Sequence, residues 1–573
     1  MGAVTISPDD VSCAIRTAQN WKSPGPDGLH NFWLKWFRCS HSCLAAQFQQ
    51  ALELGSPPPS LTTGVTFLLY KSGSTTEAKN YRPITCLPTL YKLLTSILRA
   101  KINAHIVANN ILASAQNGCR VGSRGTKELL LIDMTICQQI RRNRGALSAA
   151  WIDYKKAYDS VPHSWLERIL ELYKVDTALR AFLSACMRQW TTVLRQPGGG
   201  DESPGPQDFI RIERGIFQEG IRRSVKERFF SRLTKVLNSL LSGGNKVRAF
   251  NAWVMPLLTY SFGILRWTQT ELDALDRRVR SLLTTHRMLH PRSSVMRLYI
   301  PRKCGGRGFL NAKDLHNREV YNLRNYFLNN ECGMHRDVVA VDRNLTPLSL
   351  ANENWRKPVV LSTADRKAAW ESKVLHGRFY KALTGPDVDL LASVNWLRFG
   401  DLFGETEGFA CAIADEVMMT NNYRKYILKD GTVDICRACR RPGESLRHII
   451  SGCSHLANGE YLHRHNLVAR IIHQQLALLY GLVDREVPYY KYSPAPVLEN
   501  GRATLYWDRS IITDRTIVAN KPDIVLIDRS QRRTVLVDVT IPHDENLVKA
   551  EKDKSSKYLD LAHEITAMLS TGC

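Results

Sequence analysis

The hydrophobic positions in the first part of the chain follow two different periods. Leu87–Ile106 repeats apolar residues three and four positions apart, which predicts a helix with one buried stripe. The stripe consists of Leu90, Tyr91, Leu94, Ile97, Leu98 and Ile102. Helices are also predicted over His30–Leu54 and Leu129–Arg142, whereas the apolar run Gly64–Tyr70 predicts a strand. Asn80–Ile84 follows that strand across a polar loop, so the two segments predict a hairpin.

Ala150–Leu166 is a short apolar run that leads into an amphipathic helix, with the sequence AWIDYKKAYDSVPHSWL. Asp153 lies in the apolar run, and Pro162 suits a turn or the first residues of a helix. A carboxylate at the end of a buried strand is unfavourable unless it meets a cation. A divalent metal that gathers phosphates is the usual cation at such a place. The other interpretation is a strand-end aspartate that caps the following helix.

The middle of the chain is basic. Phe209–Gln218 alternates like a strand, and Val225–Leu241 and Leu272–Met288 predict cationic helices. The apolar run Phe250–Trp267 contains a proline and polar residues, so we expect buried helices rather than a membrane span. His290–Phe309 interleaves basic and aromatic residues, a composition that suits a nucleic-acid groove.

Composition and charge indicate several domains and an anionic partner. The 573 residues exceed the roughly 250–300 that one core holds. Lys and Arg number 78 against 54 Asp and Glu, and the resulting net charge of +24 favours nucleic acid, the commonest large anion. The N-terminal residues lack the pattern of a secretory signal, and no uninterrupted apolar run is long enough to span a bilayer. We therefore expect an intracellular protein with no membrane partner.

Three of the 14 cysteines group tightly with a histidine, in the spacing Cys-x2-Cys-x8-His-x4-Cys. The four residues are Cys436, Cys439, His448 and Cys453. Soft and borderline ligands at this spacing suit tetrahedral Zn²⁺. Alternative third or fourth ligands follow closely, namely His455, His463 and His465. The competing interpretation is a set of free buried thiols.

Two predicted strands near the C-terminus bring two carboxylates together. Ala519–Asp528 and Thr534–Ile541 predict a hairpin across a polar turn, with Asp523 and Asp538 close to each other. A long charged helix, His543–Ser570, follows and is rich in lysine. Two carboxylates near one metal, with a lysine, can cleave phosphodiesters, because the metal polarises the phosphate and lowers the pKa of a water. The alternative is a hairpin with surface carboxylates.

The order and spacing of Ala150–Leu166 resemble the first catalytic motif of reverse transcriptases, especially those of non-long-terminal-repeat retrotransposons. The resemblance implies that Asp153 holds catalytic Mg²⁺ and that Tyr158 packs under the sugar of the incoming nucleotide. It also implies that the hairpin supplies Lys71 and Arg82 to the triphosphate, where fixed cations stabilise the leaving pyrophosphate.

Two further segments extend the resemblance. Phe209–Gln218 is similar to the motif under the template and nascent base pair, which implies a nucleotide-binding role for Gly215 and Gln218. Gln116–Glu128 corresponds to a loop that contacts the template. Its candidates for phosphate binding are Arg120, Arg124 and Lys127.

The sequence departs from the reverse transcriptase pattern directly after Gln218. The family continues to a hairpin with an aromatic–x–Asp–Asp tetrad, but here Glu219-Gly220-Ile221 follows, and the only adjacent aspartates in the chain are Asp9 and Asp10. Two metals need ligands from both carboxylate motifs. We therefore expect that polymerase chemistry is lost and that the palm sheet is incomplete. A true internal deletion and a mis-joined gene model are both open explanations.

The C-terminal hairpin and helix resemble the restriction-like endonuclease of site-specific retrotransposons, which a similar cysteine–histidine knuckle precedes. The resemblance implies that Asp523 and Asp538 hold Mg²⁺. Because position 540 is Thr540 rather than a lysine, the catalytic lysine is expected from the following helix. Lys554 is the first choice and Lys557 the second.

These expectations define an α+β multidomain protein. In order, the predicted parts are a truncated right-hand polymerase with fingers and partial palm (1–218), a thumb-like basic helical region (219–310), a helical linker (311–430), a zinc knuckle (431–470) and an α/β restriction-like endonuclease (495–573). We expect a retrotransposon-derived RNA-directed DNA polymerase and endonuclease fragment that acts in the nucleus on an RNA template and a DNA target. The alternatives are a stand-alone nicking nuclease and a non-catalytic nucleic-acid-binding remnant.

Overall fold

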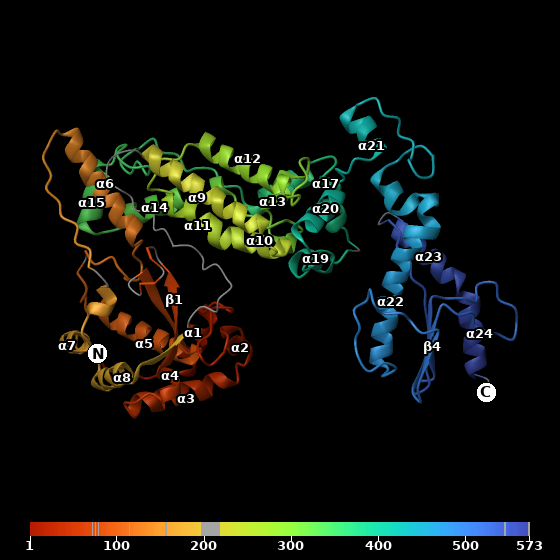
Figure 1. Ribbon diagram of the computed structural model, residues 1–573, viewed down its shortest axis with the longest axis horizontal. Helices are drawn as coiled ribbons and strands as arrows, with labels where there is room; N and C mark the ends of the chain where they lie inside the picture. The colour runs from red at the N-terminus through yellow and green to blue at the C-terminus, as the bar shows by residue number, and fades with distance from the viewer. Residues whose placement is uncertain are drawn as a thin grey trace. The chain divides into compact units, whose positions relative to one another are not determined.

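A computed structural model describes most of the chain, which divides into two compact units (Figure 1). The described residues are 1–70, 73–74, 76–77, 80–113, 115–154, 157–195, 218–386, 388–543 and 546–570. The first unit comprises Met1–Glu227, Thr259–Trp267 and His316–Pro358. The second unit comprises Arg228–Leu258, Thr268–Leu315 and Val359–Cys573.

A helical core dominates the N-terminal part of the first unit. Helices α1 (Pro8–Thr17), α3 (Ser40–Glu53), α5 (Thr89–Ala108) and α8 (Thr177–Gln189) bury their apolar faces against one another. The stripe predicted for α5 is largely buried, with Leu94 at its centre. Shorter helices in this part are α2 (Asn31–Trp36), α4 (Pro59–Thr62), η2 (Ala157–Ser160) and α7 (His163–Leu172). The single helix predicted over 30–54 is therefore two helices, α2 and α3.

A three-stranded sheet accompanies this core, in the order β2-β1-β3. β1 (Thr63–Tyr70) pairs antiparallel with β2 (Tyr81–Cys86), so the predicted hairpin is present. β3 (Thr191–Arg195) pairs in parallel with β1. One face of the sheet leaves Phe67, Ile84 and Val193 exposed.

The segment that carries Asp153 is not a buried strand, so that expectation was wrong. Trp151, Ile152 and Tyr154 are exposed, with Ile152 at 78%, and residues 147–154 have no regular secondary structure. A strand is stable in a core only when neighbouring strands take up its backbone N–H and C=O groups. Among the described residues no strand pairs with this segment.

A second layer of the first unit packs α6 (Thr126–Arg142) against α14 (Ala312–Leu328) and α15 (Gly333–Val341). Its core includes Leu131, Leu323 and Val338. The boundary between the two units falls within two helices, α9 (Gln218–Asn238) and α11 (Met255–Ser261). The alternating pattern predicted that Gln218 ends a strand. In the structure Gln218 is instead the first residue of α9.

The second unit begins with helices and short turns. Its elements before the knuckle are α10 (Gly243–Ala249), η3 (Phe250–Val254), α12 (Gln269–Thr285), α13 (Val295–Tyr299), η4 (Arg302–Cys304), α16 (Thr363–Glu371), α17 (Gly377–Leu383), α18 (Leu390–Ser393), α19 (Asn395–Arg398), α20 (Gly404–Ala414), α21 (Asn421–Tyr423) and η5 (Arg424–Leu428). The apolar run over 250–267 forms η3, α11 and the turn after them. None of the described helices is long and apolar enough to cross a membrane.

Three arginines of the basic segment 290–309 are internal rather than available to nucleic acid. Arg297 is buried and pairs with Asp415 at 3.0 Å. Arg302 and Arg307 contact the buried carboxylate of Glu407 at 2.6 Å and 2.8 Å. The expected nucleic-acid groove therefore does not include these cations, because neutralising buried carboxylates occupies them.

A four-stranded antiparallel sheet ends the second unit, in the order β4-β5-β6-β7. Its strands are β4 (Val497–Glu499), β5 (Ala503–Trp507), β6 (Ile524–Asp528) and β7 (Arg533–Val537). Helix α22 (Leu462–Leu479) contributes Ala477 to a core with Leu505 and Leu526, and Figure 1 shows α22 beside the sheet. The hairpin predicted from the two carboxylate-bearing segments is β6–β7.

The long C-terminal helix predicted over 543–570 is broken into two. Helix α23 spans Leu547–Lys557, and Tyr558 is its C-cap residue. Helix α24 (Leu559–Ser570) begins at the next residue. Tyr558 is buried, and its hydroxyl donates to Asp538 Oδ1 at 3.0 Å. The break therefore falls where a side chain of the helix is anchored to the end of the sheet.

Candidate metal centre and carboxylate cluster

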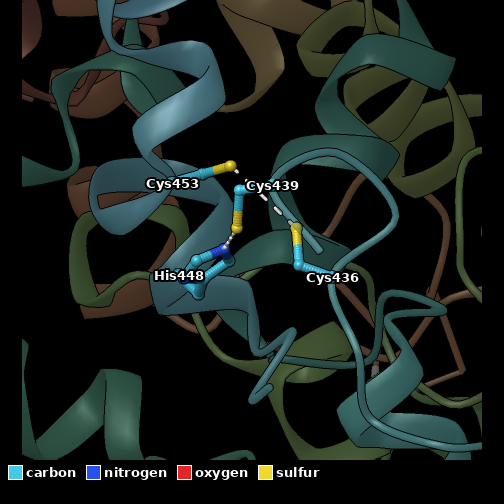
Figure 2. A group of neighbouring side chains, drawn as sticks. All are labelled: Cys436, Cys439, His448 and Cys453. Atoms are coloured by element: carbon cyan, nitrogen blue, oxygen red, sulfur yellow. Dashed lines mark hydrogen bonds between the residues drawn. The ribbon is translucent and has the colours of Figure 1, made fainter. Parts of the chain in front are cut away.

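The four predicted knuckle ligands converge on one point (Figure 2). One ligand atom from each of Cys436, Cys439, His448 and Cys453 lies within 4.8 Å of the others. The sulfurs of Cys436 and Cys453 are 3.9 Å apart, and Cys439 Sγ is 3.3 Å from His448 Nε2. Tetrahedral zinc with Zn–S bonds of about 2.3 Å requires sulfurs about 3.8 Å apart. The residues present therefore fit a zinc ion.

Short-range backbone contacts set this geometry. Arg440, between the second cysteine and the histidine, has a left-handed φ of 61°, and its N–H donates to Cys436 O at 3.0 Å. His448 begins the turn η6 (His448–Gly452), and the chain continues through η7 (Ser454–Leu456) and η8 (Ala457–Tyr461). The hydroxyl of Tyr461 accepts from Cys453 N at 3.1 Å and lies 3.1 Å from His448 O. One tyrosine thus connects the last two ligands.

The thiols differ in their tendency to ionise. Burial opposes ionisation of Cys436, but the backbone N–H groups of Cys439 and Ala438 outweigh it and lower its pKa to about 6. The N–H of Arg441 favours the Cys439 thiolate, but burial and the neighbouring sulfurs of Cys436 and Cys453 raise the pKa of that thiol. Neighbouring thiolates repel one another because they carry like charges. A divalent metal ion bound between them removes this repulsion.

The histidine in the group of candidate ligands is His448. The other histidines that the sequence offered as ligands are not part of this group. His455 and His463 are exposed. His465 lies on α22, where its Nε2 is 3.1 Å from Asp523 Oδ2. It therefore belongs to a different cluster.

That second cluster forms where β6 and β7 meet α23. Asp523 directly precedes β6 and Asp538 directly follows β7, and the two strands are antiparallel neighbours. Asp523 Oδ2 accepts a hydrogen bond from Val539 N at 2.6 Å. Asp538 Oδ2 makes an ion pair with Lys554 Nζ. The structure thus brings together the two carboxylates and the lysine that the sequence singled out.

Tyr558 holds the other oxygen of Asp538. Its hydroxyl contacts Asp538 Oδ1 and Lys521 O, each at 3.0 Å, and lies 2.8 Å from Lys557 Nζ. Burial, together with the hydrogen bond and charge of Asp538, raises the pKa of Tyr558 to about 12. Lys557, the second-choice lysine, therefore contacts the tyrosine, whereas Lys554 contacts the carboxylate.

The sequence interpretation missed the place of His465. Its Nε2 lies within 3.1 Å of Asp523 Oδ2 and 3.0 Å of Val539 O. These partners are 58 and 74 residues away in the chain. A single sequence carries no local signal for such a contact, and the nearer knuckle made it a more obvious metal ligand.

The residues expected to form a polymerase site are not gathered in one place among the described residues. Asp153 is exposed and belongs to no group of three or more potential metal ligands among the described residues. The carboxylates needed to hold two Mg²⁺ ions are thus not gathered around Asp153 in the described part of the chain. Arg82 lies on β2 opposite Leu69. Lys71 and Gly215 lie outside the described residues, as do the side chains of Tyr158 and Gln218.

Lys127, a phosphate-binding candidate, is instead held inside the first unit. Its ammonium contacts Glu319 at 2.5 Å and the backbone carbonyl of Thr259 at 2.9 Å. Arg120 donates to Ala113 O at 3.4 Å, and Arg124 is exposed above the ring of Tyr326. Arg120 and Arg124 are thus both exposed, whereas Lys127 is taken up by internal contacts.

Residues 70–204 match the family described as Reverse transcriptase (RNA-dependent DNA polymerase). The chain therefore carries a reverse transcriptase domain. Its relatives show that the domain is of the type found in non-long-terminal-repeat retrotransposons. The match ends before Phe209–Gln218 and the break that follows it.

Three relatives share the similarity. The chain is 29% identical over 216 residues to the Retrovirus-related Pol polyprotein from type-1 retrotransposable element R2 of Popillia japonica, covering 37% of this chain and 28% of that protein. It is 28% identical over 182 residues to the Transposon TX1 uncharacterized 149 kDa protein of Xenopus laevis, covering 31% and 14%. It is 26% identical over 163 residues to the Probable RNA-directed DNA polymerase from transposon BS of Drosophila melanogaster, covering 28% and 18%. The aligned part thus spans less than a third of each relative.

Proposed function

We propose that this chain is a retrotransposon-derived fragment whose C-terminal region, 495–573, nicks DNA with the help of Mg²⁺. The observation that carries the proposal is the convergence of Asp523, Asp538 and Lys554 at one end of a sheet. Two carboxylates and a lysine at one site provide metal ligands and a cation beside a scissile phosphate. The cluster also fits Mg²⁺ because it offers hard carboxylate oxygen donors.

Each residue has a distinct role in this proposal. Asp523 and Asp538 would hold Mg²⁺, which polarises the phosphate and lowers the pKa of a bound water. Lys554 places its charge beside the water or the phosphate oxygen, where negative charge develops during cleavage. Tyr558 fixes the orientation of Asp538, and His465 fixes that of Asp523. Orientation by a second hydrogen-bonding partner is what a carboxylate ligand needs to bind metal in one geometry.

For the N-terminal region we propose that polymerase chemistry is absent. The sequence lacks the second carboxylate motif, and the exposed position of Asp153 supports an incomplete palm. The knuckle, in this proposal, binds one zinc ion. RNA and DNA are the expected partners of the whole chain, because a reverse transcriptase domain is combined with a net charge of +24.

The nuclease proposal is tested with supercoiled plasmid, Mg²⁺ and purified full-length chain. Lys554→Met removes the cation that touches Asp538 while keeping the length of the side chain, and Lys552→Met is the matched control because Lys552 is exposed on the same helix. We expect wild type and Lys552→Met to convert supercoiled plasmid to the nicked form, and Lys554→Met and Asp538→Asn to be at least about 100-fold slower, as for loss of one strong electrostatic contact in a transition state.

Two results would contradict the proposal. Nicking that is equal in all four proteins would show that the cleavage comes from elsewhere. Absence of nicking in wild type, with DNA binding intact, would favour the alternative of a non-catalytic nucleic-acid-binding remnant.

A further inference from the structure

An open pocket of about 480 Å³ in the first unit has no part in the nuclease or knuckle. Asn322 and Asn325 of α14 line it, together with Asn329, which directly follows the helix. Asn322 and Asn325 lie three positions apart, so they project from one face of the helix. Arg124, from the loop before α6, also lines the pocket. Its volume is in the range of about 300–1,000 Å³ that holds small-molecule ligands.

Hydrogen bonds hold two of the residues that line the pocket, Tyr326 and Arg124. Tyr326, which also lines it, donates its hydroxyl to the buried carboxylate of Glu128 at 2.7 Å. His335 Nε2 contacts the other oxygen of Glu128 at 2.7 Å, and Arg124 N donates to Glu128 Oε2 at 3.0 Å. The guanidinium of Arg124 lies over the Tyr326 ring, 5.4 Å from its centroid. Lining residues that are already held by several contacts cost a ligand little ordering free energy.

The chemistry of the lining favours a nucleobase over a phosphate or a metal ion. One cation, Arg124, is balanced by one carboxylate, Glu331, while the remaining polar groups are mostly amides, including Asn330. An amide offers a donor and an acceptor side by side and pairs with both N6 and N7 of adenine. A planar guanidinium or aromatic ring provides a face on which an unpaired base stacks. Among the described residues, the side chains of Asn322 and Asn329 have no hydrogen-bond partner.

We propose that this asparagine pocket binds an unpaired adenine of single-stranded RNA. Adenine would stack on the Arg124–Tyr326 pair and be read at its edge by the asparagine amides of the pocket. The net charge of +24 supplies sequence-independent attraction for the RNA backbone, and the pocket would add base selectivity to it. The inference does not depend on the C-terminal nuclease.

The test uses full-length protein and fluorescein-labelled 12-residue RNAs of adenine or cytosine only, with binding followed by anisotropy. The double variant Asn322→Ala/Asn329→Ala removes two amides from the pocket. Asn354→Ala is the control, because Asn354 is an exposed asparagine of the same unit and does not line the pocket. We expect wild type and Asn354→Ala to prefer the adenine RNA by about tenfold. The double variant should bind both RNAs with the affinity that wild type shows for cytosine.

A second measurement locates the base. An adenine RNA that contains one 8-azidoadenosine is irradiated with each protein, and the cross-linked peptides are identified by mass spectrometry. Cross-links to residues 322–331 in wild type that disappear in the double variant support the proposal. A wild type without adenine preference, a preference that survives in the double variant, or cross-links confined to other segments would overturn it. Circular dichroism of the double variant ensures that a lost preference is not lost folding.

Discussion

Tyr558 combines two tasks at a single position, because it ends helix α23 and fixes Asp538. Its ring is buried, and its hydroxyl reaches both Asp538 Oδ1 and Lys521 O. The side chain is thus part of the fold and of the carboxylate cluster at the same time.

We predict that Tyr558→Phe lowers the free energy of unfolding by about 1–3 kcal/mol, because a half-buried carboxylate loses a donor. The raised pKa of Tyr558, about 12, means that the neutral phenol stabilises the fold. Its contribution is complete below the ordinary tyrosine pKa of about 10 and is lost as the pH rises towards about 12. Urea unfolding of both proteins at pH 8 to 11 checks this, with Tyr489→Phe, at an exposed tyrosine, as the control. A difference between the proteins that grows with pH would show that the phenol is not the stabilising form.

His448 and His465 are close in sequence but belong to two different sites. We predict that His448→Ala loses the zinc ion whereas His465→Ala retains it, because only His448 lies among the sulfurs. The measurement is the zinc content of each purified protein by mass spectrometry. Plasmid nicking should fall in His465→Ala, because Asp523 loses an orienting partner. Loss of zinc from His465→Ala would reassign this histidine to the knuckle.

At the scale of the elements, α20 and the turn η4 are joined through buried charges. Glu407 of α20 accepts from Arg302 and Arg307. Glu407 and Arg307 are buried and Arg302 is half-buried, so the charges depend on one another. Burial opposes ionisation of Glu407, but the two arginines outweigh it and hold its pKa below the usual value. The cations of this segment thus serve helix packing, although their sequence pattern suited nucleic acid.

We predict that Glu407→Gln lowers the free energy of unfolding by about 3–5 kcal/mol, because it leaves buried arginine charges uncompensated. Glu405→Gln, an exposed position of the same helix, should change it by less than about 0.5 kcal/mol. The stabilisation by Glu407 is present above the ordinary carboxyl pKa and is lost as the pH falls through its lowered value. Thermal unfolding at pH 7 and near pH 4 measures both effects. Equal losses of unfolding free energy in the two variants would show that the ion pairs of Glu407 do not stabilise the fold.

At the scale of the whole molecule, the reverse transcriptase domain and the C-terminal cluster differ in completeness. The domain match covers residues 70–204, and no second carboxylate motif follows in the sequence. Residues 147–154 are exposed, and none of the described strands pairs with them. In the C-terminal cluster, by contrast, Asp538 contacts Lys554 and Tyr558, and Asp523 lies directly before the neighbouring strand.

We predict that the chain extends no primer on an RNA template with Mg²⁺, because one palm carboxylate motif cannot hold two metal ions. The measurement is incorporation of labelled deoxynucleotides on a primed RNA, with an active reverse transcriptase as the positive control. Extension that Asp153→Ala abolishes would show that the palm is complete. Sequencing the native transcript across residues 215–223 would then show whether a missing segment restores the aromatic–x–Asp–Asp tetrad.

The sequence by itself determined the features that depend on near neighbours. The periodicity of α5, the β1–β2 hairpin and the β6–β7 hairpin follow from local patterning and short turns. The four knuckle ligands could be chosen because they lie within one short segment and share one chemistry. The proximity of Asp523 and Asp538 followed from antiparallel pairing alone.

Only the tertiary structure decided what depends on distant partners. An apolar run around Asp153 becomes a strand only if other strands accept its backbone groups, and none of the described strands does. Whether Arg297 or Lys127 faces solvent depends on a carboxylate that folding brings from elsewhere, Asp415 or Glu319. The physical reason is the same in each case: periodicity records which face of an element is apolar, but the partner of a charge or of a backbone group is set by the packing of the whole unit.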